Sequence, residues 1–355
     1  MNIELLKRLC EISSISGSEQ SMRKAVAEEM RPLVDTVEAD VMGNLIGVKI
    51  GPGNGPRVMI AAHIDEIGFR VRSIDSKGFI SLHAVGGWDP RAMFAQRVLV
   101  HGFAGTVLPG TLMPGIRPKH LQSPEEASKA TKLEDYFVDL GLPAEKVKSM
   151  VEVGDMVTMN RTCELIGDTV VSKALDNRLS VFVMIEALRM VQGMPLTATI
   201  LAVATTQEEV GVRGAKTAAY ALKPDIGIAL DVTLAVDIPG TPESESVTQL
   251  GNGTAIKVQD GSLICHPKVV RHFRDLAEEK GIKYQLELLP HGGTDASAVQ
   301  LSRSGVPSFT LSTPTRYVHT VNEMAHLDDI QASIDLLAAF LESAGTRDYG
   351  YSGEF

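Results

Sequence analysis

The sequence contains few cysteines and no long apolar runs. Its three cysteines, Cys10, Cys163 and Cys265, are odd in number and far apart, so they predict neither a disulfide framework nor a Cys-x-x-Cys metal site. No apolar stretch has the length of a membrane span, and the N-terminal residues lack the apolar core of a signal peptide. We therefore expect a reduced, cytoplasmic protein that does not enter a membrane.

An excess of basic charge is also absent. The chain has 34 lysine and arginine residues against 44 aspartate and glutamate residues, which gives a net charge of -10. A nucleic-acid-binding protein would need a clustered basic face, so we expect no nucleic-acid partner. Hydrophobic residues make up 44% of the 355 positions, which is enough for a large core and about two domains.

Local sequence patterns predict one domain inserted into another. Residues 67–162 are rich in glycine and valine and contain short β-like runs separated by turn residues, so we expect a small all-β module there. Its acidic segment, 123–137, is expected to form a loop or a short helix. Residues 1–66 and 163–355 contain apolar strands alternating with helices, which is typical of an α/β sheet covered on both faces. Three domains in series would leave the N-terminal strands without a sheet to join.

Hydrophobic periodicity locates the elements of the α/β part. A first helix is expected after Ser18. The other expected helices cover residues 176–192, 212–223, 267–281, 294–305 and 327–345. The expected strands cover residues 43–50, 56–64, 197–206, 225–232, 283–289 and 305–312.

Acidic residues and histidines follow several of the expected strands. In open α/β sheets, ligands bind at the carboxyl ends of the strands, so these side chains are expected to converge on one cleft. Asp176 stands at a predicted helix start and is expected to join them. The strand-end residues are His63 and Asp65 at strand 56–64, Glu208 and Glu209 after strand 197–206, Asp231 in strand 225–232, and His319 after strand 305–312.

Each of these residues also has a simpler structural explanation. His63 could be a hydrogen-bonded core histidine, Asp65 could stabilise a turn, and Asp176 could cap a helix. Glu208 and Glu209 could be loop carboxylates in solvent. Such separate explanations leave the shared position at the strand ends unaccounted for.

Two histidines and several carboxylates supply the donor atoms of a dinuclear metal site. Two divalent cations about 3.5–4 Å apart can hold a hydrolytic water and a carbonyl oxygen, and these donors suit zinc or cobalt. His63 and Asp65 lie two positions apart on the expected strand, so both side chains leave the same face and Asp65 can orient the imidazole. Glu208 and Glu209 point in different directions from an extended backbone. One of them can therefore bind metal while the other faces the substrate water.

Six motifs occur in the order and spacing of a known family. They are AAHIDEIGF, KALDNR, QEEVGVRGA, ALDV, GGTDAS and PTRYVHT. Through these motifs the chain resembles the glutamyl/leucyl aminopeptidases, cytosolic dinuclear metallopeptidases that include the tetrahedral (TET) aminopeptidases. The resemblance covers essentially the whole chain, including GGWDPRAMFAQRV within residues 67–162. It implies a mixed sheet covered by helices on both faces, of the phosphorylase/hydrolase-like type. It also implies that residues 67–162 form a small inserted PDZ-like β-barrel that mediates oligomer contacts.

The resemblance implies a role for each matching site residue. Asp176 corresponds to a carboxylate that bridges two metal ions. One ion would take His63 and Asp231, and the other would take Glu209 and His319. Glu208 corresponds to the general base and Asp65 to the residue that orients His63.

The implied reaction is removal of the N-terminal residue from short peptides by a water that two metal ions activate and Glu208 deprotonates. The resemblance also implies a homo-oligomer, commonly a tetrahedral dodecamer with an internal chamber. The segment 291–297, HGGTDAS, is either part of the substrate-binding loop or a plain turn into a helix. Arg316 is expected to brace the His319 loop rather than to bind substrate.

Three other functions use parts of the same pattern. A dinuclear deacylase or deacetylase of N-acyl amino acids would need the same metal set. A catalytically silent peptide-binding scaffold could retain the fold, but an intact base and ligand set argues against it. A glycosidase needs two acids several ångströms apart across a sugar, which the adjacent Glu208 and Glu209 do not supply.

Overall fold

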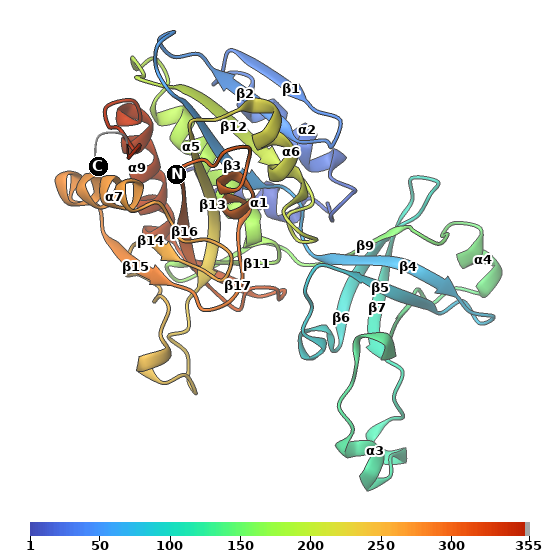
Figure 1. Cartoon of the computed structure of the whole chain (residues 1–355). Coiled ribbons are helices and arrows are strands. Elements are labelled where there is room, and N and C mark those ends of the chain that lie inside the picture. Colours follow the sequence, from blue (N-terminus) through green and yellow to red (C-terminus); the bar gives the residue numbers. More distant parts are fainter. Residues whose placement is uncertain (352–355) are drawn as a thin grey trace.

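The computed structural model describes residues 1–351 and divides into an α/β part and a β-barrel (Figure 1). The α/β part contains an eleven-stranded mixed sheet with helices on both faces, and the barrel is a closed ring of six strands. The chain leaves the sheet after strand β3 (Arg57–His63) and returns to it at β10 (Glu164–Ile166). The barrel strands lie between these two points. The predicted fold class is therefore confirmed.

Four parallel strands form the centre of the sheet. They pair in the order β12 (Thr199–Thr205), β3, β13 (Ile226–Leu234) and β16 (Ser308–Arg316). Almost every residue of β3, β12 and β13 is buried, as expected for strands covered on both faces. Because the four strands are parallel, their carboxyl ends lie along one edge.

Further strands, most of them joined by antiparallel pairing, extend this centre on both sides. Strands β1 and β2 continue the sheet beyond β12, and β17, β11 and β10 continue it beyond β16. Strand β14 pairs with both β15 and β16. The bounds of these strands are β1 (Thr36–Ala39), β2 (Leu45–Lys49), β11 (Thr169–Ser172), β14 (Thr254–Gln259), β15 (Tyr284–Leu288) and β17 (Glu323–His326).

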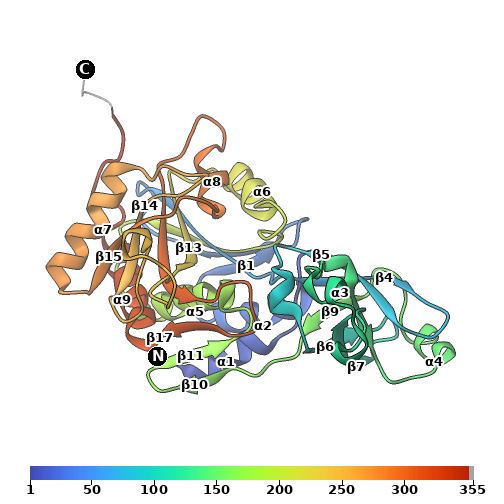
Figure 2. The same cartoon turned by 90° about the horizontal axis from the view of Figure 1, so that it is seen from below.

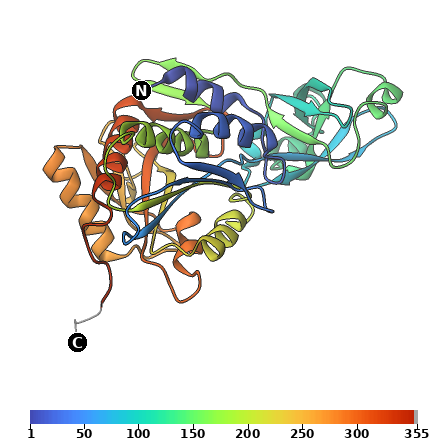
Figure 3. The ribbon, with the colours of Figure 1, turned by 90° about the horizontal axis from the view of Figure 1, so that it is seen from above.

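Helices cover the two faces of the sheet with separate cores. Alternate residues of β3 point to opposite faces, so Val58 and Ile60 enter one apolar cluster while Met59 and Ala61 enter another. Figures 2 and 3 show α6 and α8 on one side of the sheet, with α1, α2, α5 and α9 on the other. The helices are α1 (Ile3–Glu11), α2 (Gln20–Met30), α5 (Leu175–Met190), α6 (Arg213–Leu222), α7 (Pro267–Lys280), α8 (Asp295–Gln300) and α9 (Leu327–Ser343).

The barrel projects from one side of the α/β part and has its own apolar core (Figure 1). Its strands close in the order β4, β5, β8, β7, β6 and β9. Hydrogen bonds join it to the N-terminal segment, because Arg70 donates to the carbonyl of Ser16 and Ser13 contacts Thr158. The elements are β4 (Gly68–Ile74), β5 (Ile80–Val85), β6 (Gln96–His101), β7 (Val107–Pro114), α3 (Pro124–Ser128), β8 (Tyr136–Asp139), α4 (Ala144–Lys148) and β9 (Met156–Met159).

Several details differ from the sequence-based expectations. Helix α1 and strand β14 were not predicted. Helix α8 is half as long as the expected helix over 294–305, and β16 continues to Arg316 instead of ending at residue 312. The expectation that Asp65 lies on a strand is wrong, because β3 ends at His63. Within the described residues, no helix is long and apolar enough to cross a membrane.

Candidate metal centre

The predicted site residues meet at the carboxyl edge of the central strands. His63 is the last residue of β3, and Asp231 lies in the carboxyl half of β13. Glu208 and Glu209 follow β12, and His319 follows β16. Asp176 reaches the same point from the start of α5. Asp176 has non-helical backbone angles at this point, and its Oδ1 atom accepts no hydrogen bond from the backbone of α5.

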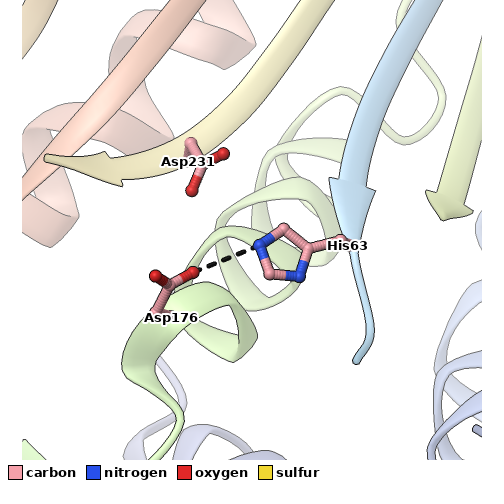
Figure 4. Close-up of side chains that lie close together, drawn as sticks. All are labelled: His63, Asp176 and Asp231. Atoms are coloured by element: carbon pink, nitrogen blue, oxygen red, sulfur yellow. Dashed lines mark ion pairs between the residues drawn. The ribbon is translucent and has the colours of Figure 1, made fainter. Parts of the chain in front are cut away.

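A first group consists of His63, Asp176 and Asp231 (Figure 4). Each offers one donor atom, and these atoms all lie within 4.8 Å of one another. The Nε2 atom of His63 is 3.1 Å from Oδ1 of Asp176. Donors at 2.0–2.2 Å from one tetrahedral ion lie about 3.3–3.6 Å apart, so this spacing is close to that of two ligands of one cation.

A second group consists of Asp176, Glu209 and His319, again with donor atoms within 4.8 Å of one another. The Nε2 atom of His319 is 3.4 Å from Oδ2 of Asp176 and 3.3 Å from Oε2 of Glu209. Asp176 therefore belongs to both groups, with Oδ1 towards His63 and Oδ2 towards His319. This arrangement is the one a carboxylate needs to bridge two cations.

Glu208 belongs to neither group. Its Oε2 atom is 3.8 Å from Nε2 of His63, so the side chain lies at the site although it is a member of neither three-residue group. The adjacent Glu209 instead faces Asp176 and His319. The two neighbouring carboxylates thus have different surroundings.

Asp65 is fully buried and accepts hydrogen bonds from the backbone of the loop that carries Glu208 and Glu209, here called the glutamate loop. Its Oδ1 accepts from the N–H of Glu208 at 3.1 Å, and its Oδ2 accepts from the N–H of Glu209 at 3.2 Å and from Ser16 Oγ at 2.6 Å. The Nδ1 atom of His63 is 3.5 Å from Oδ1 of Asp65 but 3.1 Å from the Asp65 backbone oxygen. The backbone carbonyl is therefore the nearer partner of the imidazole.

The site contains more carboxylates than its two imidazoles could neutralise. Burial, followed by repulsion from Asp231 and other carboxylates, raises the pKa of Glu208 well above its usual value. Burial and the charge of Asp176 likewise raise the pKa of Glu209 and Asp231. A divalent cation would offset this repulsion.

The same carboxylates raise the pKa values of the two histidines. Burial lowers the pKa of His319, but its contacts with Asp176 and Glu209 outweigh burial and raise the pKa to about 12. For His63, burial is again outweighed, by Asp176 and Asp65, and the pKa rises. Each imidazole thus occupies a position that favours a positive charge, which a bound cation would supply.

Two buried carboxylate oxygens support the same conclusion. Oε1 of Glu209 is shielded from solvent and has no hydrogen-bond partner, and the equally shielded Oδ1 of Asp176 makes an ion-pair contact with His63 without hydrogen-bond geometry. Buried carboxylate oxygens normally have partners. The donor set, its spacing and these two oxygens therefore fit divalent cations.

Two further features of the site were not predicted from the sequence. Glu323 on β17 accepts hydrogen bonds from the backbone N–H groups of Asp176 and His319. The barrel also reaches the site, because a Cβ atom on Gly87 would lie 3.4 Å from Nδ1 of His319. The paired glycines before Trp88 were a sequence signal for this close approach, whereas nothing near Glu323 in the sequence marks it.

Two secondary expectations concern Arg316 and the HGGTDAS segment. Arg316 forms a two-pronged pair with Asp237, at 2.7 Å and 2.6 Å, which agrees with a bracing role. Thr294 and Asp295 of the HGGTDAS segment are buried, and Thr205 donates a hydrogen bond to Asp295. Asp295 thereby ties the start of α8 to the end of β12.

Comparison with known proteins identifies the class to which this fold and site belong. The family model of the M42 glutamyl aminopeptidases matches residues 43–336. The glutamyl aminopeptidase of Lactococcus lactis is 31% identical over 347 residues, with 96% of each chain covered. An aminopeptidase structure from the archaeon Desulfurococcus kamchatkensis has a TM-score of 0.92 at 39% identity, covering 97% of this chain and 95% of that one. The TET1 peptidase of Pyrococcus horikoshii has a TM-score of 0.85 at 30% identity, covering 96% and 98%.

The chain belongs to the M42 glutamyl aminopeptidase family. It is accordingly a hydrolase that acts on peptide bonds, and the family resemblance seen in the sequence motifs is confirmed.

Proposed function

We propose that the protein removes N-terminal residues from short peptides at a centre that holds two divalent metal ions, zinc or cobalt. The observation that carries this proposal is the position of Asp176, whose two oxygens face His63 and His319 separately. His63, Asp176 and Asp231 would hold one ion, and Asp176, Glu209 and His319 would hold the other. When bound, the ions would polarise the peptide carbonyl and lower the pKa of a water molecule.

Glu208 is the general base in this proposal. It lies at the site outside both ligand groups, so it is free to take a proton from the attacking water. The water oxygen then bonds to the carbonyl carbon, the C–N bond breaks, and Glu208 returns the proton to the leaving amine. Asp65 holds the backbone of Glu208 and Glu209 while this occurs.

The barrel supplies contacts between copies of the chain. Several large apolar side chains on it are exposed, which a lone subunit would leave in water. The TET1 peptidase of Pyrococcus horikoshii assembles into a tetrahedron or an octahedral shell, and we expect a homo-oligomer of this kind, such as a dodecamer, in the cytoplasm. The exposed barrel residues include Phe103, Val107, Ile116, Leu121 and Val153.

A substrate panel tests this function. The protein would be stripped with a chelator, reloaded with zinc or cobalt, and assayed on aminoacyl-p-nitroanilides and on N-acetyl amino acids. We expect activity on the free amino-terminal substrates, loss on chelation and recovery on reloading. Activity confined to the N-acetyl compounds would instead indicate a deacylase. No activity on either class from the loaded protein would favour a binding scaffold.

A further inference from the structure

Glu323 connects two segments of the site that are far apart in the sequence. It is the first residue of β17, and it lies opposite Ser172, the last residue of β11, in the antiparallel register. Asp176 follows Ser172 by four positions, and His319 precedes Glu323 by four positions. This strand pairing brings one buried carboxylate, 2% exposed, between the two ligand-bearing segments.

Each oxygen of Glu323 accepts one backbone hydrogen bond. Oε2 accepts from the N–H of Asp176 at 2.9 Å, and Oε1 accepts from the N–H of His319 at 2.8 Å. Asp176 and His319 are the two members of the second ligand group that lie outside the glutamate loop. The carboxylate therefore fixes the distance between two backbones whose side chains meet at Nε2 and Oδ2, 3.4 Å apart.

The backbone at this point needs such support. His319 and Tyr317 both have positive φ angles, of 62° and 59°, a conformation that is strained for residues other than glycine. The His319 side chain is also the more exposed imidazole, at 35% against 2% for His63. His63 is held by its place in β3 and by the contact of its ring with the Asp65 backbone oxygen, whereas a hydrogen bond to Glu323 holds the backbone of His319.

We propose that Glu323 is a positioning residue that sets the affinity of the ligand group formed by Asp176, Glu209 and His319. This inference rests on the proposed function, since it concerns an ion held at that group. Glu323 touches neither substrate nor ion. It acts by keeping Asp176 and His319 at the separation that one cation requires. Partners of this kind alter metal affinity or activity by about 10–100-fold when they are replaced.

The chain offers a matched control for a purely structural role. Asp329 in the first turn of α9 is also a fully buried carboxylate that accepts two backbone hydrogen bonds, from Gly251 at 2.7 Å and Gly253 at 2.6 Å. Its bonds hold a loop that carries none of the proposed ligands. Asp329→Asn and Glu323→Gln therefore remove the same kind of interaction, but only the second disturbs ligand residues.

The experiment measures metal binding directly. Wild-type protein, E323Q, E323D and D329N would be stripped with a chelator and titrated calorimetrically with zinc and with cobalt. Circular dichroism and thermal unfolding of the metal-free proteins would check the fold. Glutamine has one acceptor oxygen and would present an N–H₂ donor to the second backbone N–H, whereas aspartate keeps both acceptors on a shorter side chain.

We expect two ions per wild-type subunit, with one of them bound about 10–100-fold more weakly by E323Q. E323D should lose less affinity than E323Q, and D329N should bind both ions as the wild type does even if its thermal stability falls. Unchanged ion affinities in E323Q, or equal losses in E323Q and D329N, would overturn the positioning role. If E323Q does not fold, E323D carries the test: weaker binding of one ion supports the positioning role, and wild-type affinity for both ions overturns it. A wild-type chain that takes up no ion would contradict the proposed function itself.

Discussion

Oδ1 of Asp65 accepts a hydrogen bond from the backbone N–H of Glu208 at 3.1 Å. This bond links the end of β3 to the loop after β12, and so it ties the segment of His63, a proposed metal ligand, to Glu208, the proposed general base. Because Oδ2 also holds the next residue, Glu209, one buried carboxylate sets the position of both adjacent glutamates.

Asp65→Asn should therefore impair catalysis without unfolding the protein. Asparagine has one acceptor oxygen, so at least one N–H of the glutamate loop would face an N–H₂ donor. We expect kcat to fall by about 10–100-fold, measured with the best aminoacyl-p-nitroanilide. Asp75→Asn is the matched control, since Asp75 is exposed in a barrel turn and accepts from the backbone of Lys77 and Phe79. An equal loss of kcat in both variants would show that Asp65 has no special role.

Gly214, in the first turn of α6, packs closely against Thr206 at the start of the loop that carries Glu208 and Glu209. A Cβ atom there would lie 2.3 Å from Oδ1 of Asn44 and 2.4 Å from the carbonyl oxygen of Thr206. Asn44 in turn accepts from the N–H of Thr206 and donates to the carbonyl of Gly214. Gly214→Ala should therefore lower the free energy of unfolding by about 1–3 kcal/mol.

The control for this prediction is Gly53→Ala, because a Cβ on Gly53 would meet no atom within 4 Å. We expect a change within about 0.5 kcal/mol for that variant. Urea unfolding of both variants measures the difference. Equal stability of the two variants would contradict this prediction, because it would show that the atoms around Gly214 move to fit the added methyl group at little cost.

His272, on α7, should make stability depend on pH in a part of the chain that carries none of the proposed metal ligands. Burial, with a smaller contribution from Arg347 and some compensation from Asp275, lowers the pKa of His272 from 6.5 to about 4. The neutral ring contacts Tyr349 through Nδ1 and Ser343 through Nε2. Since the unfolded chain takes up the proton at higher pH than the folded one, stability is fully present above pH 6.5 and is lost as the pH falls towards 4.

The loss attributable to His272 is at most about 3 kcal/mol. His272→Gln cannot take up that proton. The difference in unfolding free energy between wild type and variant should therefore shrink as the pH is lowered from 7 to 4. Urea titrations at several pH values measure it, and a difference that stays constant across this range would contradict the assignment.

The sequence was sufficient to locate the residues that follow buried strands. His63 and Asp231 belong to apolar runs long enough to predict central strands, and the carboxyl edge of a parallel sheet is a known place for ligands. The hydrogen bonds of Asp65 and Glu323 were not predictable in this way. They depend on where separate strands end and pair, and β11 and β17 are separated by about 150 residues in the chain.

The missed elements have equally specific reasons. Strand β14 contains Lys257, a charge in the middle of an apolar run, and only the folded chain brings Glu287 to 2.9 Å and Asp260 to 3.3 Å from its ammonium group. Helix α1 has Leu5, Leu6 and Leu9 on its buried face. That spacing is typical of an amphipathic helix, so the sequence does contain a signal for α1.

The most direct test of the account compares Glu208→Gln with Glu209→Gln in one series of metal titrations and turnover assays. We expect E208Q to bind both ions as the wild type does and to lose about 10²–10⁴-fold in kcat. E209Q should bind one of the two ions more weakly. Loss of an ion from E208Q, or full turnover by E208Q with both ions bound, would contradict the division of roles between these two neighbouring glutamates.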